Sequence, residues 1–353
     1  MQLGPEEKRE LESVLADFEK FRKKKYRSYR VFTLLRKPFK IVYILAVPAA
    51  VLAAILPFLL PFFLPVILLG IGLFILETVL YNFVFKKPDE KFHHRFKTEI
   101  MPLAFQKINH RFHYFPDRKF SKQQVMNMSL FKEAISGYHG EDHVVGKVLD
   151  VDIEFCEASL YTERYSAGTV LRGVLANVLE GVIDSGGMGP DDNSNEFSKQ
   201  VCFFKGLLLE VDFHKSFKGV VYAVPKHHVD AGLFKKSSFL GREKVSTGNV
   251  NFDQYYSVFA SEEVLLHYVL TPAMLDKVLH LKEQLGAEIF LSLKHGKLHL
   301  GVNWGRDLFE CDFKKGIPSI EDFIALARDV ELFEFIVTSL SQERRIWGDK
   351  ALS

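Results

Sequence analysis

The longest apolar stretch of the chain lies near its N-terminus and predicts a membrane hairpin. No residue from Ile41 to Leu76 is charged, and Pro57, Pro61 and Pro65 fall in the middle of this stretch. One helix over this stretch would be about 54 Å long, whereas the hydrocarbon core of a bilayer is about 30 Å thick. Because proline interrupts a helix, we expect two transmembrane helices, at about residues 40–56 and 64–85, in a hairpin that occupies residues 40–86.

Basic residues flank the apolar stretch on both sides. Ten lysines and arginines and no acidic residue lie between Lys20 and Lys40, and five lysines and arginines follow between Lys86 and Lys97. Cytoplasmic loops of membrane proteins carry an excess of such residues, so we expect both termini in the cytoplasm. The alternative that the prolines leave open is a re-entrant or interfacial hairpin that does not cross the bilayer.

The segment before the hairpin, residues 1–39, is predicted to be a basic cytoplasmic helix. Leu11, Leu15 and Phe18 recur at spacings of three and four, as on one face of a helix. Its basic second half suits anionic lipid headgroups, worth about 1 kcal/mol per charge near the surface. The two alternatives are a solvated charged helix and a helix that pairs with another copy of the chain.

Residues 87–353 have the pattern of a cytoplasmic α+β domain of antiparallel strands with packed helices. Apolar and polar residues alternate in several short runs, as in half-buried strands. The predicted strands are Val148–Phe155, Phe203–Phe213, Gly219–Val224, Phe252–Ala260, Ile289–Leu293, Leu298–Val302 and Leu308–Phe313, with a hairpin turn at His295-Gly296. The predicted helices are Lys97–Phe112, Ser121–Ala134, one between Thr271 and Gly286, and one that starts at Ser319.

An inserted segment at residues 167–197 differs from its surroundings. Pairs of apolar residues recur at every fourth position between Val170 and Ile183, which predicts a helix with a broad apolar face over residues 167–187. A run rich in Gly, Pro and Asp follows and is typical of a flexible loop. The helix either covers the sheet or docks onto a protein partner, another copy of the chain or the bilayer.

Composition narrows the classes of function. The chain has 353 residues, of which 25% are charged and 48% hydrophobic, and its net charge is +2, so it has no general affinity for nucleic acid. Cys156, Cys202 and Cys311 are far apart in the sequence and form no CxxC pair, which argues against a disulfide framework or a cysteine-based zinc site. The sequence contains no glycine-rich nucleotide-binding motif and no hydrolase motif.

Histidine-rich runs are the first candidate sites. The run Tyr138-His139-Gly140-Glu141-Asp142-His143 offers two histidines and two carboxylates that could bind a divalent metal. Its glycines instead favour a turn that enters a strand at Val144, with a carboxylate accepting backbone N–H bonds. The pairs His93-His94, His110 with His113, and His227-His228 show no firm acidic third ligand and are interpreted as ordinary loop or surface histidines.

Acidic residues on two predicted strands are the second candidate. They are Asp150, Asp152 and Glu154 on one strand, and Glu210, Asp212 and His214 on the other. If the strands pair, the carboxylates would crowd together, and some would gain a raised pKa or bind a cation. That arrangement would support acid–base or metal chemistry. A solvated sheet face explains the same alternation, and we assign no catalytic, cofactor-binding or metal-binding residue.

An ordered series of motifs resembles a known family. The motifs are Gly140-Glu141-Asp142-x-x-x-Gly146, Phe204-Lys205-Gly206-Leu-Leu-Leu-x-x-Asp212-Phe213, Phe217-x-Gly219, Phe259-Ala260-Ser261, Tyr268-Val-Leu270-Thr271-Pro272 and Asp307-Leu-Phe309-Glu310. Together with the basic helix and the hairpin, the series resembles the bacterial membrane-protein family known as domain of unknown function 3137, over roughly residues 15–345. The resemblance implies a bacterial inner-membrane protein with a cytoplasmic α+β domain, and it implies no established activity.

The sequence therefore favours a binding or scaffolding module at the inner membrane over an enzyme. The expected partners are the lipid bilayer and a protein or second copy, bound through the 167–187 helix or the N-terminal helix. Two alternatives stay open. One is a membrane-tethered, metal-dependent enzyme that uses the acidic strand faces, and the other is a regulatory module of a neighbouring transporter.

Overall fold

The structure is a computed structural model. It describes residues 5–56, 58, 60–108, 110–148, 151–165, 198–212, 219–230, 238–311, 314, 316–323 and 337–338. The chain forms two compact units. The first comprises Met1–Ile108 with Glu310–Ala325, and the second comprises Asn109–Phe309 with Leu326–Ser353.

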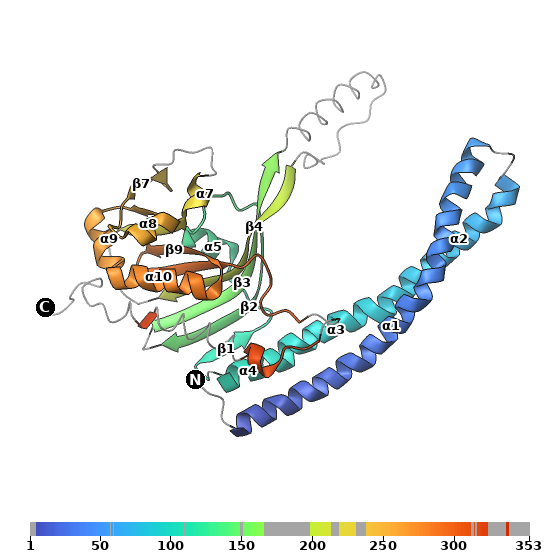
Figure 1. Cartoon of the computed structure of the whole chain (residues 1–353), viewed down its shortest axis with the longest axis horizontal. Helices are drawn as coiled ribbons and strands as arrows, with labels where there is room; N and C mark the ends of the chain where they lie inside the picture. The colour runs from blue at the N-terminus through green and yellow to red at the C-terminus, as the bar shows by residue number, and fades with distance from the viewer. Residues whose placement is uncertain are drawn as a thin grey trace, which may run out of the picture. The chain divides into compact units, whose positions relative to one another are not determined.

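The first unit is a long antiparallel helical hairpin (Figure 1). Its first arm is α1 (Pro5–Ile55). Its second arm runs without a break through α2 (Leu60–Tyr81), η2 (Asn82–Lys86), α3 (Lys87–Arg95), η3 (Phe96–Ile100) and α4 (Met101–Ile108). The arms pack at their charged end, where the rings of Phe18 and Phe92 stack 4.9 Å apart and Lys107 Nζ lies 2.6 Å from Glu10 Oε2.

Helix ends in this unit differ from the expected segment boundaries. Helix α1 continues across residues 39 and 40, and the second arm continues across residues 86 and 87. A change from polar to apolar side chains does not interrupt helical hydrogen bonding, which involves backbone groups alone. The helix predicted from Lys97 ends at Ile108 rather than Phe112, because Phe112 pairs with Gly146 in a sheet.

The two-span hairpin is not confirmed as two membrane crossings. Among the described residues, one helix, Pro61–Lys107, is long and apolar enough to cross a membrane. The apolar part of α1 within the same described ranges, Leu45–Ile55, is shorter. These two findings rest on length and composition alone.

The second unit is built on an antiparallel sheet. Its strands are β1 (Phe112–Phe115), β2 (Gly137–Val148), β3 (Val151–Tyr165), β4 (Ser198–Asp212), β5 (Val220–Pro225), β6 (Ser238–Phe239), β7 (Arg242–Val245), β8 (Tyr256–Ala260), β9 (Glu288–Lys294) and β10 (Lys297–Asn303). In the described part of the chain they form one ten-stranded sheet in the order β1-β2-β3-β4-β10-β9-β5-β8-β7-β6. The α+β class with antiparallel strands and packed helices is therefore confirmed.

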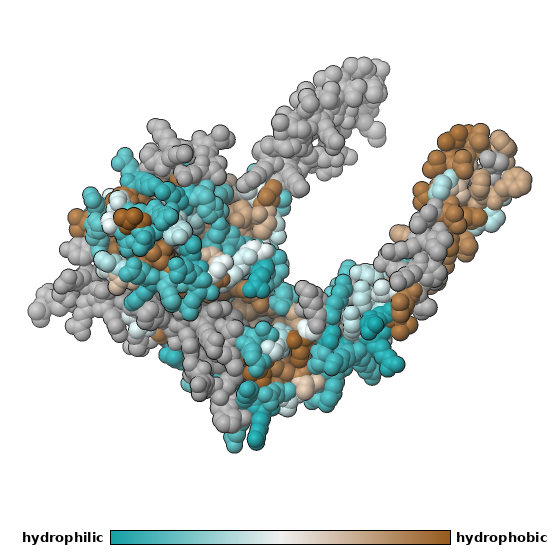
Figure 2. Space-filling model, viewed as in Figure 1, coloured by the Kyte–Doolittle hydropathy of each residue, from teal (hydrophilic) through white to brown (hydrophobic). Residues whose placement is uncertain are grey.

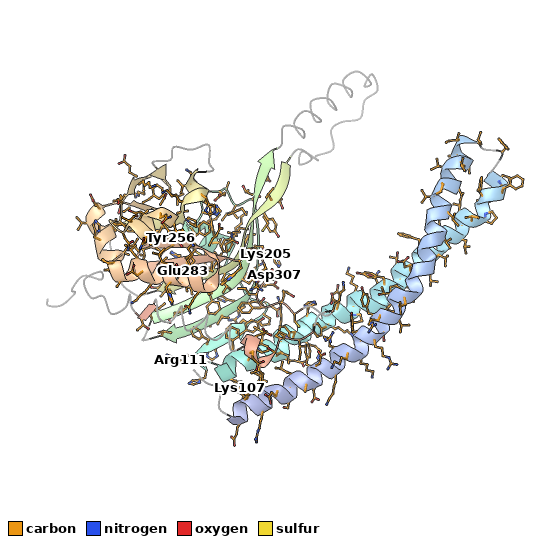
Figure 3. The ribbon with its side chains drawn as sticks, in the orientation of Figure 1. Lys107, Arg111, Lys205, Tyr256, Glu283 and Asp307 are labelled. Atoms are coloured by element: carbon orange, nitrogen blue, oxygen red, sulfur yellow. The ribbon has the colours of Figure 1, made fainter. Side chains whose placement is uncertain are left out.

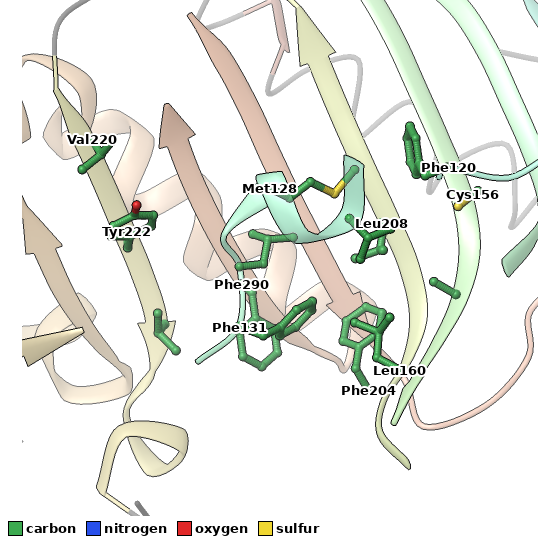
Figure 4. Packing of buried hydrophobic residues seen from close by; sticks show 14 of the residues in the cluster. Phe120, Met128, Phe131, Cys156, Leu160, Phe204, Leu208, Val220, Tyr222 and Phe290 are labelled. Carbon is green, nitrogen blue, oxygen red and sulfur yellow. The ribbon is translucent and has the colours of Figure 1, made fainter. Parts of the chain in front are cut away.

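One face of the sheet carries an aromatic core. The core includes Phe204 of β4, Tyr222 of β5 and Phe290 of β9, which are buried in one cluster with Met128 of α5 (Lys122–Met128) (Figure 4). The ring of Phe131, just after α5, lies 4.9 Å from Phe204 and 5.0 Å from Phe290. This cluster fixes which face of each strand points toward α5.

Four more helices complete the second unit within the described residues. They are α7 (Lys226–Asp230), α8 (Val250–Tyr255), α9 (Glu263–Val269) and α10 (Pro272–Leu285). Helix α10 contacts β9 and α8 and buries five apolar residues. Its predicted ends are confirmed: the Thr271 side chain accepts a hydrogen bond from Met274 N, and Gly286 takes the left-handed conformation that often follows a helix.

Several other predicted elements are confirmed. The predicted hairpin at His295-Gly296 joins β9 to β10, with both residues at positive φ as a two-residue turn requires. The strands over 203–213 and 219–224 correspond to β4 and β5. The helix from Ser319 begins as expected, since Ser319 and Asp322 cap each other, and its remainder lies outside the described residues.

Other predicted elements are wrong. Residues 148–155 belong to two strands rather than one, because Val148 at the end of β2 pairs with Val151 at the start of β3. Apolar and polar residues alternate along most of this run, so the pattern does not reveal the change of strand. Residues 252–255 lie in α8, where the Asn249 side chain caps the helix. Residues 308–311 form no strand among those described, and the helix predicted over 121–134 ends at Met128, followed by Ser129 at positive φ. The predicted helix at 167–187 lies outside the described residues.

Candidate functional site

The two acidic strand faces do meet, as the sequence predicted for paired strands. Asp152 of β3 lies opposite Asp212 of β4, and Glu154 lies opposite Glu210. Lysines of the neighbouring strands pair with three of these carboxylates. Lys297 Nζ of β10 lies 2.6 Å from Glu210 Oε1 and 3.2 Å from Asp212 Oδ2, and Lys147 Nζ of β2 lies 3.1 Å from Asp152 Oδ1. The arrangement is an ion-pair ladder in which lysines supply the positive charge. Asp150 and His214 lie outside the described residues.

The ladder perturbs Glu210 strongly. Burial alone would raise the pKa of its carboxyl, but hydrogen bonds from His299 and Lys297 outweigh burial and lower the pKa to about 2. His299 Nε2 lies 3.2 Å from Glu210 Oε2. Glu210 therefore stays ionised at neutral pH and serves as an anchor for cations rather than as a proton donor.

The histidine-rich run 138–143 is a strand rather than the expected turn. It belongs to β2, and a bulge between Glu141 and Val144 places Asp142 at positive φ. Asp142 is buried and accepts a hydrogen bond from the Tyr114 hydroxyl. His139 is exposed and His143 is buried, so the run does not gather its histidines into one site.

Two of the histidine pairs separate in the structure. His93 Nδ1 lies 3.0 Å from a carboxylate oxygen of Glu310, whereas His94 lines a different surface. The interaction of the imidazole with the Glu310 carboxylate, which accepts its proton in a hydrogen bond, raises the pKa of His93. His110 lies in a turn and His113 is an exposed residue of β1. Neither pair converges on a shared ligand position.

The third pair, His227-His228, converges on an acidic residue that sequence reasoning missed. Glu288 Oε1 lies 2.6 Å from His227 Nε2, and Glu288 Oε2 lies 3.1 Å from His228 Nε2. The hydrogen bond from His228 outweighs burial and lowers the pKa of Glu288 to about 2. These three side chains are the one group in the described chain whose ligand atoms lie close enough together to hold a metal ion.

Two further residues surround Glu288. Asn303 donates an N–H to Glu288 Oε2 at 3.1 Å. Tyr256 is buried, and its hydroxyl has no hydrogen-bond partner among the described residues. Burial and the negative charge of Glu288 both raise the pKa of Tyr256. The end of the sheet formed by β5, β8, β9 and β10 is therefore a polar cluster around one carboxylate.

A hydrophobic surface covers the end of the helical hairpin at which α1 is followed by α2. Large apolar side chains of both helices are exposed there, and Figure 2 shows hydrophobic residues gathered over this end of the hairpin. Phe62 is 76% exposed and Leu68 is 59% exposed. Monomeric soluble proteins rarely expose apolar patches of such extent.

A basic groove of about 470 Å³ lies farther along the same hairpin. Phe21 of α1 faces five residues of α3 across it: Lys87, Glu90, Lys91, His94 and Arg95. The Arg95 guanidinium stacks on the ring of Phe21 at 4.7 Å and pairs with Glu99. The groove therefore combines an apolar wall with several positive charges.

Comparison with known proteins gives a family match over part of the chain. Residues 203–342 match the family described as "protein of unknown function (DUF3137)". This match supports the resemblance that the sequence motifs in this range carry. Comparison with curated proteins gives no match. Among solved structures, the mycobacterial trehalose monomycolate transport factor A, TtfA, matches with 9% identity and a TM-score of 0.31, over 65% of this chain and 89% of that one.

The DUF3137 motifs have a structural explanation in the sheet. Lys205 Nζ of β4 lies 2.7 Å from Asp307 Oδ2 (Figure 3), and the buried carboxylate of Glu157 accepts hydrogen bonds from Leu308 N and Phe309 N. Burial raises the pKa of Glu157 to about 8. These contacts hold the loop after β10 against the sheet. We therefore interpret the motif that contains Lys205 and the motif that begins at Asp307 as structural.

The three cysteines remain apart. Cys156 and Cys311 are buried, Cys202 is exposed, and none of these three described residues forms a disulfide. Burial raises the pKa of the Cys156 thiol to about 12. Cys156 is therefore unreactive at neutral pH.

Proposed function

We propose that this protein is a membrane-anchored cytoplasmic module, in which the helical hairpin fixes the sheet domain beside a bilayer so that it can bind a partner there. The observation that carries the proposal is the exposed apolar surface of α1 and α2. The 22 residues of α2 give a helix of about 33 Å, which matches the hydrocarbon core of about 30 Å. Burial in lipid removes that surface from water.

We infer a two-span arrangement with both arms leaving on the cytoplasmic side. Basic residues at both ends of the apolar stretch support this orientation. The apolar residues of α1 from Ile41 to Ile55 span only about 22 Å. A short span can be accommodated by local thinning of the bilayer and by lysines that extend toward the headgroups. The competing arrangement is a re-entrant hairpin that enters and leaves the same leaflet.

The basic groove supports the same placement. It begins at Lys87, six residues after the end of α2, where the second arm would leave the bilayer. Lysine and arginine at this level attract anionic headgroups. The apolar wall formed by Phe21 could contact the acyl–headgroup boundary. In this arrangement α3 lies at the membrane surface and the sheet domain lies on the cytoplasmic side.

A metal-dependent enzyme is the second candidate function. The acidic strand faces do not support it, because lysines already pair with their carboxylates: Lys297 with Glu210 and Asp212, and Lys147 with Asp152. The convergence of His227, His228 and Glu288 does support metal binding at another place. A regulatory role beside a transporter is compatible with the anchored module and has no separate structural support among the described residues.

Cysteine accessibility in the full-length protein tests the anchor. In a Cys202→Ser background, Phe58→Cys places a thiol at the hairpin turn, and Lys244→Cys places one at an exposed position of β7. A two-span anchor predicts that an impermeant maleimide labels Phe58→Cys in intact cells and labels Lys244→Cys only after permeabilisation. Failure of Phe58→Cys to label in intact cells, with Lys244→Cys labelled only after permeabilisation, would favour the re-entrant hairpin. Recovery of the protein in the soluble fraction would overturn the membrane proposal.

A further inference from the structure

We propose that His227, His228 and Glu288 form a binding site for a divalent transition-metal ion of the zinc class. Two imidazole nitrogens and one carboxylate are a common ligand set for zinc, and three protein ligands leave a coordination position open for water or another ligand. The ligand atoms of the three residues all lie within 4.8 Å of one another.

The sheet brings these residues together from distant parts of the sequence. Strand β5 pairs antiparallel with β9, and Ala223 lies opposite Leu291. Just beyond this pair, β5 ends and α7 begins at Lys226, which the two histidines follow directly. Strand β9 begins with Glu288 at the same end of the sheet. The convergence therefore follows from strand pairing and does not depend on a flexible loop.

The positions of two ligands are fixed by packing. The His228 ring packs against the Phe290 ring with centroids 5.0 Å apart. Asn303 orients the Glu288 carboxylate, and Asn303 itself is held by Lys205 N, which donates to its side-chain oxygen at 3.0 Å. Residues that orient metal ligands in this way raise metal affinity.

The distances allow a metal after a small adjustment. Tetrahedral zinc with bonds of about 2.0–2.1 Å holds its ligand atoms about 3.3 Å apart. The observed separations from Glu288 are 2.6 Å to His227 Nε2 and 3.1 Å to His228 Nε2. The side chain of His227 is 67% exposed and can move outward by the required fraction of an ångström. The Glu210 cluster differs, because Lys297 already supplies a cation there.

Zinc titration of the full-length, detergent-purified protein tests this proposal. The protein carries no histidine tag, and free zinc is followed with a competing fluorescent chelator. We expect one zinc ion per chain and at least a tenfold loss of affinity in each of His227→Ala, His228→Ala and Glu288→Gln. His227→Ala is informative even if Glu288→Gln unfolds, because the exposed His227 side chain contributes little packing.

Matched controls separate this site from adventitious surface binding. His280→Ala and Glu283→Gln change an exposed histidine and an exposed glutamate of α10, and both should bind zinc like the wild type. X-ray absorption should show nitrogen and oxygen ligands at about 2.0–2.1 Å. Sulfur ligands near 2.3 Å, absence of stoichiometric binding, or equal affinity in the three site variants and the controls would each overturn the proposal.

Discussion

At the scale of single residues, the buried Glu157 links the stability of the sheet domain to pH. Burial raises its pKa from 4.5 to about 8 in the folded chain. Between these values the folded protein holds a proton that the unfolded chain has released. The free energy of unfolding therefore falls as the pH rises through this window, by at most about 1.4 kcal/mol per pH unit.

Glu157→Gln should remove this pH dependence. The variant side chain cannot ionise, and its oxygen can still accept the hydrogen bond from Leu308 N. We expect the difference in melting temperature, variant minus wild type, to increase from pH 5 to pH 8 and to level off above pH 8. Thermal unfolding at several pH values measures it, with the exposed Glu283→Gln as a control that should follow the wild type. Parallel curves for Glu157→Gln and wild type would show that Glu157 does not titrate in this range.

The contacts of single residues across the sheet show which part of the candidate sites could not be predicted from the sequence. Alternation on two strands correctly placed Asp152 near Asp212 and Glu154 near Glu210, provided that the strands paired. The cation that pairs with Glu210 and Asp212, Lys297, comes from a third strand whose register no local pattern predicts. Glu288 was missed as a partner of the two histidines for the same reason, since it lies 60 positions after His228. The sequence shows which side chains carry charge, but it does not show which residues of other strands they contact.

At the scale of elements, the accurate predictions rest on signals within a few residues. The helix from Thr271 to Gly286 has a cap at each end, and the His295-Gly296 hairpin carries its own turn chemistry. Failures occurred where a distant or competing contact decides the conformation. Residues 308 and 309 give their N–H groups to Glu157 instead of a strand, and Asn249 converts an alternating run into the start of α8.

The pairing of β4 with β10 depends on a glycine of the family segment. A Cβ at Gly206 would lie 2.0 Å from the carbonyl oxygen of Val302, a backbone atom that cannot rotate away. We expect Gly206→Ala to destabilise the domain by roughly 2–4 kcal/mol or to prevent folding. Gly137→Ala, in β2, is the matched control, because its nearest neighbour is the Tyr161 side chain at 3.3 Å. Thermal unfolding that affects both variants equally would contradict this explanation.

At the scale of the whole molecule, the two units divide the proposed work. The helical unit supplies the apolar surface and the basic groove, and the sheet unit supplies the family domain and the histidine–glutamate cluster. Anchoring and binding can therefore be tested separately. Changes at the histidines of α7 and at Glu288 of β9 should alter zinc affinity without altering membrane extraction, whereas changes within α2 should do the opposite.

The remaining expectation at this scale is that the inserted segment recruits a partner. Tyr165 and Ser198 are paired residues of β3 and β4, so the ends of the insertion are adjacent in space. An Asn-Gly turn can therefore replace residues 166–197 while β3 and β4 keep their register. If the predicted helix docks a protein, this replacement should remove a specific partner from affinity-purified membranes, or dissociate a homo-oligomer in cross-linking, without shifting the melting temperature.

The control for this experiment retains the insertion and changes only its chemistry. Val174→Ser with Val178→Ser weakens the apolar face of the predicted helix at two positions that are four residues apart, and it leaves the length of the segment unchanged. Loss of the same partner in both variants would assign recruitment to that face. An unchanged set of partners and an unchanged oligomeric state in both variants would refute the docking role. The alternative is that the insertion covers the sheet. In that case the replacement should lower the melting temperature, because it exposes apolar surface of the sheet to water.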